Sequence, residues 1–370
     1  MKGRILFLVE GSTEKGSSPA ARFRVLQFLP RYAEAGWDAQ ALWSFPKKYF
    51  TAAICFRKIR PYGFLFYPIA AAGVFVMAVH RFFQILLFAP FSDIVFVQRN
   101  LLPVHCYPVL EWLASCVCGK MIFDFDDAIF SHPANPAKRF GDIPRILGFS
   151  DEVVCGNQYL ADYAKVHCRS LSVIPTVPHL PPPRDRSLEG SSVVLGWIGT
   201  SPNIPYLEMV SGVLLAVSDN APIKVLTVCD TSVRLPAGID HRHLPWSLEN
   251  EEKFFHEIDV GLMPLPEDAW TLGKCSFKAI QYISCGIPVV LSPVGMNREV
   301  APEGSGVFFA SSETEWEVAL LGLCRSAEIR KEAGRKGKEQ ALRKFSPEVV
   351  AEAYLKVFQR LLESAGGRSA

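Results

Sequence analysis

Short apolar runs that end on glycine, proline or polar residues recur along both halves of the chain, and this repetition limits the folds available to it. Runs of this kind, without alternating polar residues, are typical of parallel strands covered by helices on both faces. The clearest are Ile5–Val9, Asp93–Gln98, Met121–Phe125, Val193–Ile198, Ile223–Val228 and Ile287–Leu291. Helix-forming segments lie between them, so we predict an α/β protein built on doubly wound sheets.

A proline-rich connector, Pro181–Arg186, separates the two sets of runs. Three consecutive prolines followed by charged residues make a stiff polar segment, and a chain of 370 residues is long enough for two domains with separate cores. We therefore predict one Rossmann-like domain at 1–185 and a second at 186–345. Ser346 and Pro347 then predict the start of a last helix in the tail at 346–370.

Composition argues against several classes of protein. Charged residues make up 21% of the chain and the formal net charge is +2, which gives no electrostatic reason to expect a nucleic acid partner. The ten cysteines are scattered through apolar runs without zinc-site spacing, as in reduced cytosolic proteins. The first apolar run is too short for the core of a signal peptide, so we expect a cytoplasmic protein.

The segment at 61–91 is unusually apolar, and basic residues precede it. A pair of helices buried in the first domain is one interpretation. An apolar surface that contacts a membrane is the second, which we favour because basic and aromatic residues flank the segment. A true membrane span is the third, disfavoured because strands of one sheet lie on both sides of it. We therefore expect a peripheral protein on the inner face of the cytoplasmic membrane.

Polar residues follow several predicted strands of the first half. Arg99 and the pair Asp126 and Asp127 each come after an apolar run. The first run is followed by Gly11, in a Gly/Ser loop, and then by a helix that contains Arg22 and Arg24. Asp124 and Asp126 would point to the same face of an extended strand, as the two ligands of a metal do in a D-x-D motif. Alternatively, these carboxylates bind sugar hydroxyls at the strand edge, or cap a helix. We select Asp126 and Asp127 as candidate catalytic residues.

The second half has its own polar edge. Gly199, Thr200, Ser201 and Asn203 connect a strand to a predicted helix, where backbone N–H groups could bind a diphosphate. Trp246, which follows another strand, could stack on a nucleobase, although a tryptophan at the edge of the core is an equally good interpretation.

The segment Gly261–Glu299 reads as a strand, a long loop, a helix at Lys274–Cys285 and a second strand. On such a helix Lys274, Lys278 and Gln281 would share one stripe near the N-terminus. The ammonium groups and the helix N-terminus together would attract an anion. The alternative is that both lysines are simply solvated.

This segment resembles the nucleotide-sugar-binding region of the family 4 retaining glycosyltransferases of the GT-B class. Aligned on Cys285–Val290, the two glutamates of the usual E-x7-E pattern fall at Gly273 and Gln281, and the GKCSFK wording at 273–278 is similar to one subgroup. The phrases SPAARFRVLQFLP, DIVFVQRNLLP, FDFDDAIF and LGWIGT occur in the order expected of that subgroup. The resemblance implies two Rossmann-like domains facing a cleft, with a C-terminal helix crossing back to the first.

The resemblance also implies an activity: transfer of a hexose, with retention, from a nucleotide-diphosphate sugar to a glycan or lipid-linked acceptor, in cell-surface polysaccharide synthesis. Lys274, Lys278, Gly199 and Thr200 would stabilise the leaving diphosphate, and Gln281 would hold the ribose. Arg22, Arg24, Arg99 and Gly11 would lie on the acceptor side, in the domain at 1–185. No metal or other cofactor is implied. A sugar-nucleotide epimerase of the same fold and a non-catalytic binding protein are the alternatives.

Overall fold

The computed structural model describes residues 2–12, 18–45, 63–102, 108–131, 142–179 and 192–366. Contacts divide the chain into two compact units: unit 1 comprises Met1–Thr176 and Val350–Ala370, and unit 2 comprises Val177–Val349. This division falls somewhat before the predicted boundary at 185, and the proline-rich connector itself lies outside the described residues.

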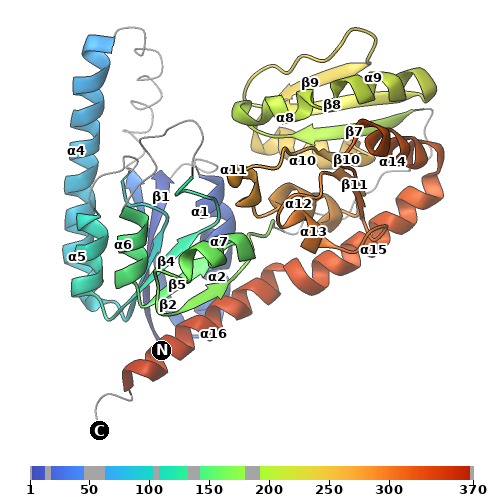
Figure 1. Ribbon diagram of the computed structural model, residues 1–370. Helices are drawn as coiled ribbons and strands as arrows, with labels where there is room; N and C mark the ends of the chain where they lie inside the picture. Colours follow the sequence, from blue (N-terminus) through green and yellow to red (C-terminus); the bar gives the residue numbers. More distant parts are fainter. Residues whose placement is uncertain are drawn as a thin grey trace. The chain divides into compact units, whose positions relative to one another are not determined.

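Unit 1 is built on a six-stranded sheet of order β2-β1-β3-β4-β5-β6 in which every pairing is parallel (Figure 1). Its strands are β1 (Gly3–Ser12), β2 (Trp37–Phe45), β3 (Ile94–Gln98), β4 (Lys120–Phe125), β5 (Glu152–Cys155) and β6 (Leu171–Val173). All of β3 is buried, as predicted for a strand covered on both faces. The chain changes direction across the sheet between β1 and β3, and such a switch point is where open α/β sheets bind ligands at their carboxyl ends.

The helices of unit 1 lie between its strands along the chain, apart from the C-terminal one. They are α1 (Pro19–Arg24), η1 (Leu26–Phe28), α2 (Leu29–Glu34), α4 (Gly63–Phe88), η2 (Ala89–Phe91), α5 (Val109–Val117), α6 (Asp142–Phe149), α7 (Gln158–Ala164) and α16 (Pro347–Gly366). The Ser18 side chain caps α1 by accepting a hydrogen bond from the Ala21 N–H at 3.3 Å. Pro30 lies in the first turn of α2, after η1, where its missing N–H breaks no helical hydrogen bond.

The C-terminal helix α16 returns to unit 1 from Val350 onward. Its Phe358 packs against the rings of Phe7, Tyr32 and Trp37. Tyr354 is also fully buried, and its hydroxyl donates to the Asp124 carboxylate at 3.3 Å. These contacts confirm the prediction that the last helix completes the first domain.

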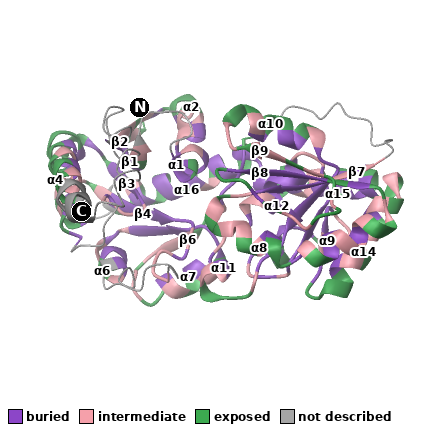
Figure 2. Ribbon diagram, turned by 90° about the horizontal axis from the view of Figure 1, so that it is seen from above, coloured by how far each residue is buried: buried purple, intermediate pink, exposed green. Residues whose placement is uncertain are grey.

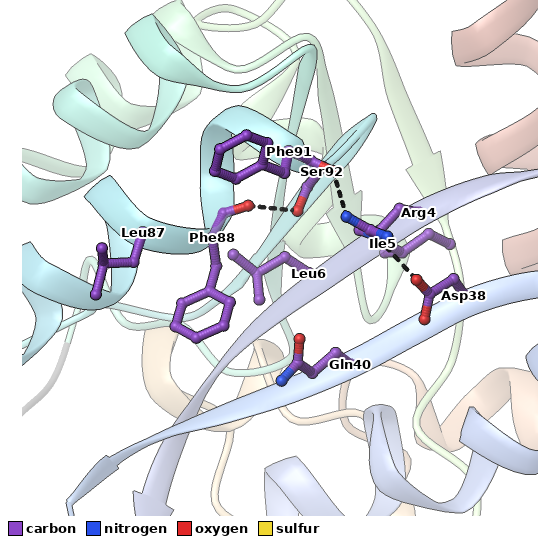
Figure 3. Close-up of a pocket in the computed structure, with 9 residues that line it drawn as sticks. All are labelled: Arg4, Ile5, Leu6, Asp38, Gln40, Leu87, Phe88, Phe91 and Ser92. Carbon is purple, nitrogen blue, oxygen red and sulfur yellow. Dashed lines mark hydrogen bonds and ion pairs between the residues drawn. The ribbon is translucent and has the colours of Figure 1, made fainter.

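The apolar segment forms one continuous helix, α4, so the interpretation as a pair of buried helices is wrong. Most of its described residues are exposed or half-exposed, as the green and pink colouring of α4 in Figure 2 shows. At its C-terminal end the Arg4 guanidinium of β1 donates to the Phe91 carbonyl at 3.2 Å, and the Ser92 hydroxyl donates to the Phe88 carbonyl at 2.8 Å (Figure 3). This end of α4 is therefore fixed to the sheet.

Unit 2 has a second six-stranded parallel sheet of order β12-β11-β10-β7-β8-β9. Its strands are β7 (Val193–Ile198), β8 (Ile223–Cys229), β9 (His241–Pro245), β10 (Val260–Met263), β11 (Val289–Leu291) and β12 (Val307–Phe309). Its helices are η4 (Ser201–Asn203), α8 (Ile204–Glu208), α9 (Ser211–Asn220), α10 (Leu248–Glu257), α11 (Ala269–Leu272), α12 (Phe277–Ser284), α13 (Asn297–Val300), α14 (Glu313–Arg325) and α15 (Ala327–Phe345). The switch point lies between β7 and β10.

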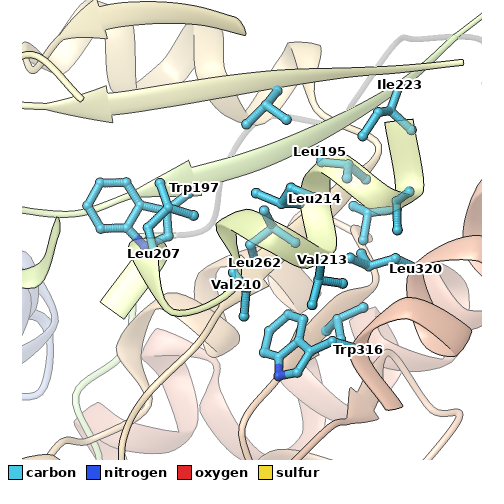
Figure 4. Packing of buried hydrophobic residues seen from close by; sticks show 14 of the residues in the cluster. Leu195, Trp197, Leu207, Val210, Val213, Leu214, Ile223, Leu262, Trp316 and Leu320 are labelled. Carbon is cyan, nitrogen blue, oxygen red and sulfur yellow. The ribbon is translucent and has the colours of Figure 1, made fainter. Parts of the chain in front are cut away.

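The core of unit 2 fills the space between the sheet and helices α9 and α14. Figure 4 shows Trp197 and Leu195 of β7 with Leu214 of α9, and Trp316 of α14 beside Val213. On the other face α12 approaches the sheet closely, because a Cβ at Gly261 of β10 would lie 2.6 Å from the Tyr282 ring. The Tyr282 hydroxyl donates to the Gly196 carbonyl at 3.2 Å, so α12 has a fixed position over the strands.

Candidate functional site

In unit 1, Arg99 links the two candidate aspartates. It directly follows β3, while Asp126 and Asp127 follow the neighbouring strand β4. The Arg99 guanidinium donates to the Asp126 carboxylate at 2.7 Å and to the Asp127 carboxylate at 2.5 Å. Glu10 at the end of β1 lies 3.8 Å from the same group. The predicted residues Arg99, Asp126 and Asp127 therefore form one charged cluster at the carboxyl edge.

The backbone of Arg99 is left-handed, with φ of 55°. An arginine rarely adopts this conformation, and backbone strain of this kind is concentrated at functional sites. The Arg99 N–H donates to the Asp124 carbonyl at 2.8 Å, and together with the two ion pairs this bond holds the residue in place.

The pKa of Asp126 is lowered. Burial alone would raise it, but the positive charges of Arg99 and Arg24, together with hydrogen bonds from Arg99 and Thr176, outweigh burial. The Thr176 hydroxyl donates to Asp126 at 3.0 Å. Asp126 is thus held in its ionised form, as a hydrogen-bond acceptor rather than a proton donor.

Arg24 and Asp124 form a fully buried ion pair beneath this cluster. Two guanidinium nitrogens of Arg24 donate to Asp124, at 2.8 and 2.5 Å, and both side chains have no exposed surface. A further nitrogen of Arg24 donates to the Thr176 hydroxyl at 2.9 Å. Arg24, predicted for the acceptor side, is therefore buried beside the cluster and bonds Asp124 and Thr176.

The other two residues predicted for the acceptor side lie in different surroundings. Gly11, near the end of β1, has a φ of 98°, which only glycine adopts without strain. Arg22 is partly buried, with its guanidinium 4.1 Å above the Phe23 ring. The D-x-D carboxylates of Asp124 and Asp126 are each bound by arginine, and within the described ranges no group of three or more His, Cys, Asp or Glu side chains is placed to hold a metal.

In unit 2, the turn after β7 is occupied by a carboxylate. Asp230, at the end of β8, accepts hydrogen bonds from the Ser201 N–H at 2.6 Å and from the Ser201 hydroxyl at 3.0 Å. The Asn203 amide donates to the Thr200 hydroxyl at 3.0 Å. The predicted helix is short: η4 is followed by the five-residue α8. One backbone donor expected to bind a diphosphate is therefore already bound to Asp230.

The prediction that Lys274 shares a helical stripe with Lys278 and Gln281 is wrong. Helix α12 begins at Phe277, because Ser276 has a left-handed φ of 49° and its hydroxyl donates to the Asn297 side chain at 2.7 Å. Lys274 lies before this break. Its N–H donates to the Thr271 carbonyl at the end of α11, at 3.1 Å. The predicted long loop thus contains a short helix, which positions Lys274 separately.

The Lys274 ammonium lies near two aromatic faces. It is 5.4 Å from the Trp270 ring centroid and 6.0 Å from that of Tyr206, within the range of cation–π attraction. Lys274 itself is partly buried.

Trp246, Lys278 and Gln281, all predicted for the donor site, belong to one hydrogen-bonded network. The Lys278 ammonium donates to the Gln281 amide oxygen at 2.9 Å, and the Gln281 amide nitrogen donates to Glu251 at 3.0 Å. The other oxygen of Glu251 accepts from the Trp246 indole at 3.0 Å. Gln281 and Glu251 are buried, so the network joins α12, α10 and the residue after β9 into a rigid unit.

Glu251 and Asp230 were not predicted as site residues. Glu251 lies in the acidic run LENEEKFF, and its distinguishing sign is position: Phe254 and Phe255 follow at i+3 and i+4, so it lies on the buried face of α10. Asp230 directly follows a strand, as the predicted residues do, but the role of its side chain depends on the pairing of β8 with β7.

A separate pocket of about 370 Å³ opens at the same edge of unit 2. It is lined by residues after β10 and β11 and by α14, among them Leu265, Ser292, Arg298 and Trp316. None of the predicted donor residues lines it. The pocket and the Lys274 region are therefore distinct features.

Comparison with solved structures identifies proteins that share this architecture. The chain is similar to sucrose-phosphate synthase from Thermosynechococcus elongatus (TM-score 0.63, 14% identity, 98% of this chain and 100% of that one). It is also similar to HepE from Anabaena in complex with UDP-glucose (TM-score 0.61, 13% identity, 97% and 100%), and to OtsA (TM-score 0.62, 14% identity, 95% and 98%). The two-domain α/β architecture is that of the GT-B glycosyltransferases, which confirms the predicted fold.

Sequence comparison adds no closer relative. No protein-family model matches the chain, and no curated protein matches it. At 13–14% identity the structural similarity establishes the fold, and the reaction has to be argued from the residues.

Proposed function

We propose that the protein is a retaining glycosyltransferase that moves a sugar from a nucleotide-diphosphate sugar to a glycan or lipid-linked acceptor. The observation that carries this proposal is a hydrogen-bonded network at the carboxyl edge of the unit 2 sheet, made of Lys278, Gln281, Glu251 and Trp246. Lys274 lies just before α12, the helix that carries Lys278 and Gln281. Two cations and a fixed carboxylate suit a ligand that combines phosphates with hydroxyl groups. The fold is shared with HepE, which has been solved with UDP and with UDP-glucose.

Lys274 is the residue we assign to the leaving diphosphate. Negative charge builds up on the phosphate oxygens as the bond to the sugar breaks, and a nearby cation stabilises that change more than it stabilises the bound donor. The Lys274 ammonium lies 5.4 Å from the Trp270 ring centroid and 6.0 Å from that of Tyr206. Lys278 would add a second charge from the first turn of α12.

Glu251 is assigned to the ribose together with Gln281. A ribose hydroxyl needs a fixed acceptor, and Glu251 is held by Trp246 on one oxygen and by Gln281 on the other. Trp246 is thereby oriented from its N–H side, which leaves its ring available for stacking on a base. For the turn after β7, we assign Gly199 and Thr200 to the phosphates, because the Ser201 N–H is bound to Asp230.

In unit 1, Asp126 and Asp127 are assigned to sugar or acceptor hydroxyls. Both follow β4, and the lowered pKa of Asp126 suits an acceptor of hydrogen bonds. No general base is needed if the reaction proceeds on one face of the sugar: the bond from the anomeric carbon to the phosphate breaks, the acceptor oxygen bonds to the same face, and a phosphate oxygen takes the acceptor proton.

The test is release of nucleoside diphosphate from a panel of nucleotide sugars, with and without candidate acceptors. Lys274→Ala is expected to lower kcat/KM on the order of a hundredfold. Lys253→Ala, which removes the same charge from the exposed surface of α10, is the matched control and should leave the rate unchanged. Conversion of the donor to an epimer without acceptor would identify an epimerase, and binding without turnover by the wild type would identify a non-catalytic protein.

A further inference from the structure

The surface of α4 has the polarity of a lipid-facing element. Every exposed residue between positions 71 and 91 is apolar. Among the large side chains of this range, those with the highest exposed fractions are Phe75 at 69%, Phe91 at 68%, Leu87 at 61% and Phe83 at 54%. The one charged side chain in this range, Arg81, has no exposed surface. We call the exposed residues of 71–91 the α4 apolar face.

Hydrogen bonds to the sheet fix the orientation of this face. The Arg81 guanidinium donates to the Val9 carbonyl at 2.5 Å, to the Ser44 hydroxyl at 2.8 Å and to the Leu42 carbonyl at 3.1 Å. Gln84, one turn later, donates to the Trp43 carbonyl at 3.1 Å. The polar side of α4 is thus bound to β1 and β2, and a rotation that buried the apolar side would break these bonds.

The C-terminal end of α4 is fixed as well. Figure 3 shows the side chains of Leu87, Phe88 and Phe91 beside a small pocket whose floor is formed by β1 and β2. Arg4, which bonds the Phe91 carbonyl, is held in turn by Asp38 at 2.8 Å. The adjacent helix α5 packs against α4 (Figure 1). Val109 and Trp112 of α5 are also exposed.

We propose that the α4 apolar face docks on the surface of an anionic lipid bilayer, with its aromatic and aliphatic side chains inserted among the acyl chains. Within the stretch from Ala71 to Phe91, an 18-residue window has a mean hydropathy of 1.8, and only 22% of that window is buried. Exposing an apolar surface of this size to water is unfavourable, because moving each large side chain out of water lowers the free energy. An interfacial helix obtains that gain by lying in the membrane plane.

Charge selects a lipid surface over a second copy of the chain. The sequence at 46–62, which leads directly into α4, contains Lys47, Lys48, Arg57, Lys58 and Arg60 and no acidic residue. Basic residues next to an apolar helix are attracted to anionic headgroups. A second copy of the chain carries the same basic residues at these positions, whereas anionic headgroups carry the opposite charge.

The contacts of Arg81 also favour surface docking over a span. A spanning helix is surrounded by lipid or by other membrane segments, whereas α4 is hydrogen-bonded along one side to two strands of the unit 1 sheet. The docking proposal does not depend on the proposed transferase activity, since it concerns binding alone.

The test is sedimentation of the purified full-length chain with vesicles, in the absence of any nucleotide sugar. Vesicles of phosphatidylcholine with phosphatidylglycerol are expected to bind the protein, and vesicles of phosphatidylcholine alone to bind it about tenfold less. Salt at about 0.5 M should weaken binding to the anionic vesicles by screening the basic residues.

A variant with Phe75→Ser, Phe83→Ser and Leu87→Ser is expected to lose vesicle binding at least about tenfold while keeping the thermal unfolding midpoint of the wild type, because these side chains are already exposed. The matched control carries Val166→Ser and Val318→Ser, and should bind as the wild type does. These exposed apolar residues lie just after α7 and on α14, and are 71% and 67% exposed.

Three results would overturn the proposal. One is a wild type that sediments with neither type of vesicle. Another is a wild type that is a stable dimer which the triple variant dissociates, since that would make the face a contact between copies. The third is retention of the protein in cell membranes after an alkaline carbonate wash, which would show that α4 spans the bilayer.

Discussion

The Gln281 amide nitrogen donates a hydrogen bond of 3.0 Å to the Glu251 carboxylate, and both side chains are buried. An uncharged residue at position 281 is therefore required by its neighbour: a second carboxylate here would meet Glu251 within hydrogen-bonding distance. The oxygen of the same amide accepts a hydrogen bond from the Lys278 ammonium at 2.9 Å, so the amide links Lys278 to Glu251. This pair accounts for an amide rather than a carboxylate at position 281.

We predict that Gln281→Glu lowers the free energy of unfolding by about 1–3 kcal/mol at neutral pH, because two buried carboxylates in contact cannot both stay ionised without cost. Combining Gln281→Glu with Glu251→Gln should restore most of the loss, since one amide and one carboxylate again face each other. Urea unfolding of the two single variants and the double variant measures this. An equal loss in the double variant would contradict the pairing.

The buried pair Arg24–Asp124 leads to a second prediction. Arg24→Met leaves Asp124 charged without its main partner and should cost about 3–5 kcal/mol of unfolding free energy. Adding Asp124→Leu removes that charge, so the double variant should be more stable than Arg24→Met alone. The unfolding midpoint in urea reports both values. A double variant that is less stable than either single one would show that the pair is not the dominant interaction.

The fold could be predicted from the sequence because it depends on patterns local to each element. Buried parallel strands such as β3 are continuous apolar runs, and Ser18 before Pro19 marks the start of α1. The position of Lys274 could not be predicted in this way. Its separation from α12 depends on Ser276, whose left-handed backbone is stabilised by a hydrogen bond to Asn297, distant in the sequence.

The sequence predicted that candidate residues lie at strand ends, but it did not predict their hydrogen-bond partners. Strand ends correctly indicated Arg99, Asp126 and Asp127 as neighbours at one edge. The two residues that the sequence did not single out, Glu251 and Asp230, take their roles from contacts across elements, with α12 in one case and the turn after β7 in the other. Such contacts follow from the register and packing of the folded chain, which periodicity does not specify.

A third prediction concerns metal dependence. In the proposed reaction Lys274 and Lys278 supply the positive charge that stabilises the leaving diphosphate, so activity should persist in the presence of EDTA. Nucleoside diphosphate release measured before and after dialysis against the chelator tests this. Loss of activity that is restored by added Mg²⁺ or Mn²⁺ would contradict the assignment and would make a metal the diphosphate partner.

The fourth prediction is a pH dependence of stability that comes from Asp126. Its folded pKa is lowered by Arg99, Arg24 and Thr176 against the effect of burial, so the folded state binds a proton less readily than the unfolded state. The resulting stabilisation is present in full above about pH 4, the ordinary range of an unfolded aspartate, and is lost as the pH falls through the lowered folded value.

We expect Asp126→Asn to reduce the free energy of unfolding on the order of 2 kcal/mol near neutral pH, and by progressively less below about pH 4. Glu34→Gln, at an exposed position of α2 in the same unit, is the control and should show no such trend. A difference between wild type and Asp126→Asn that stays constant down to about pH 2.5 would mean that the lost interaction is steric rather than electrostatic.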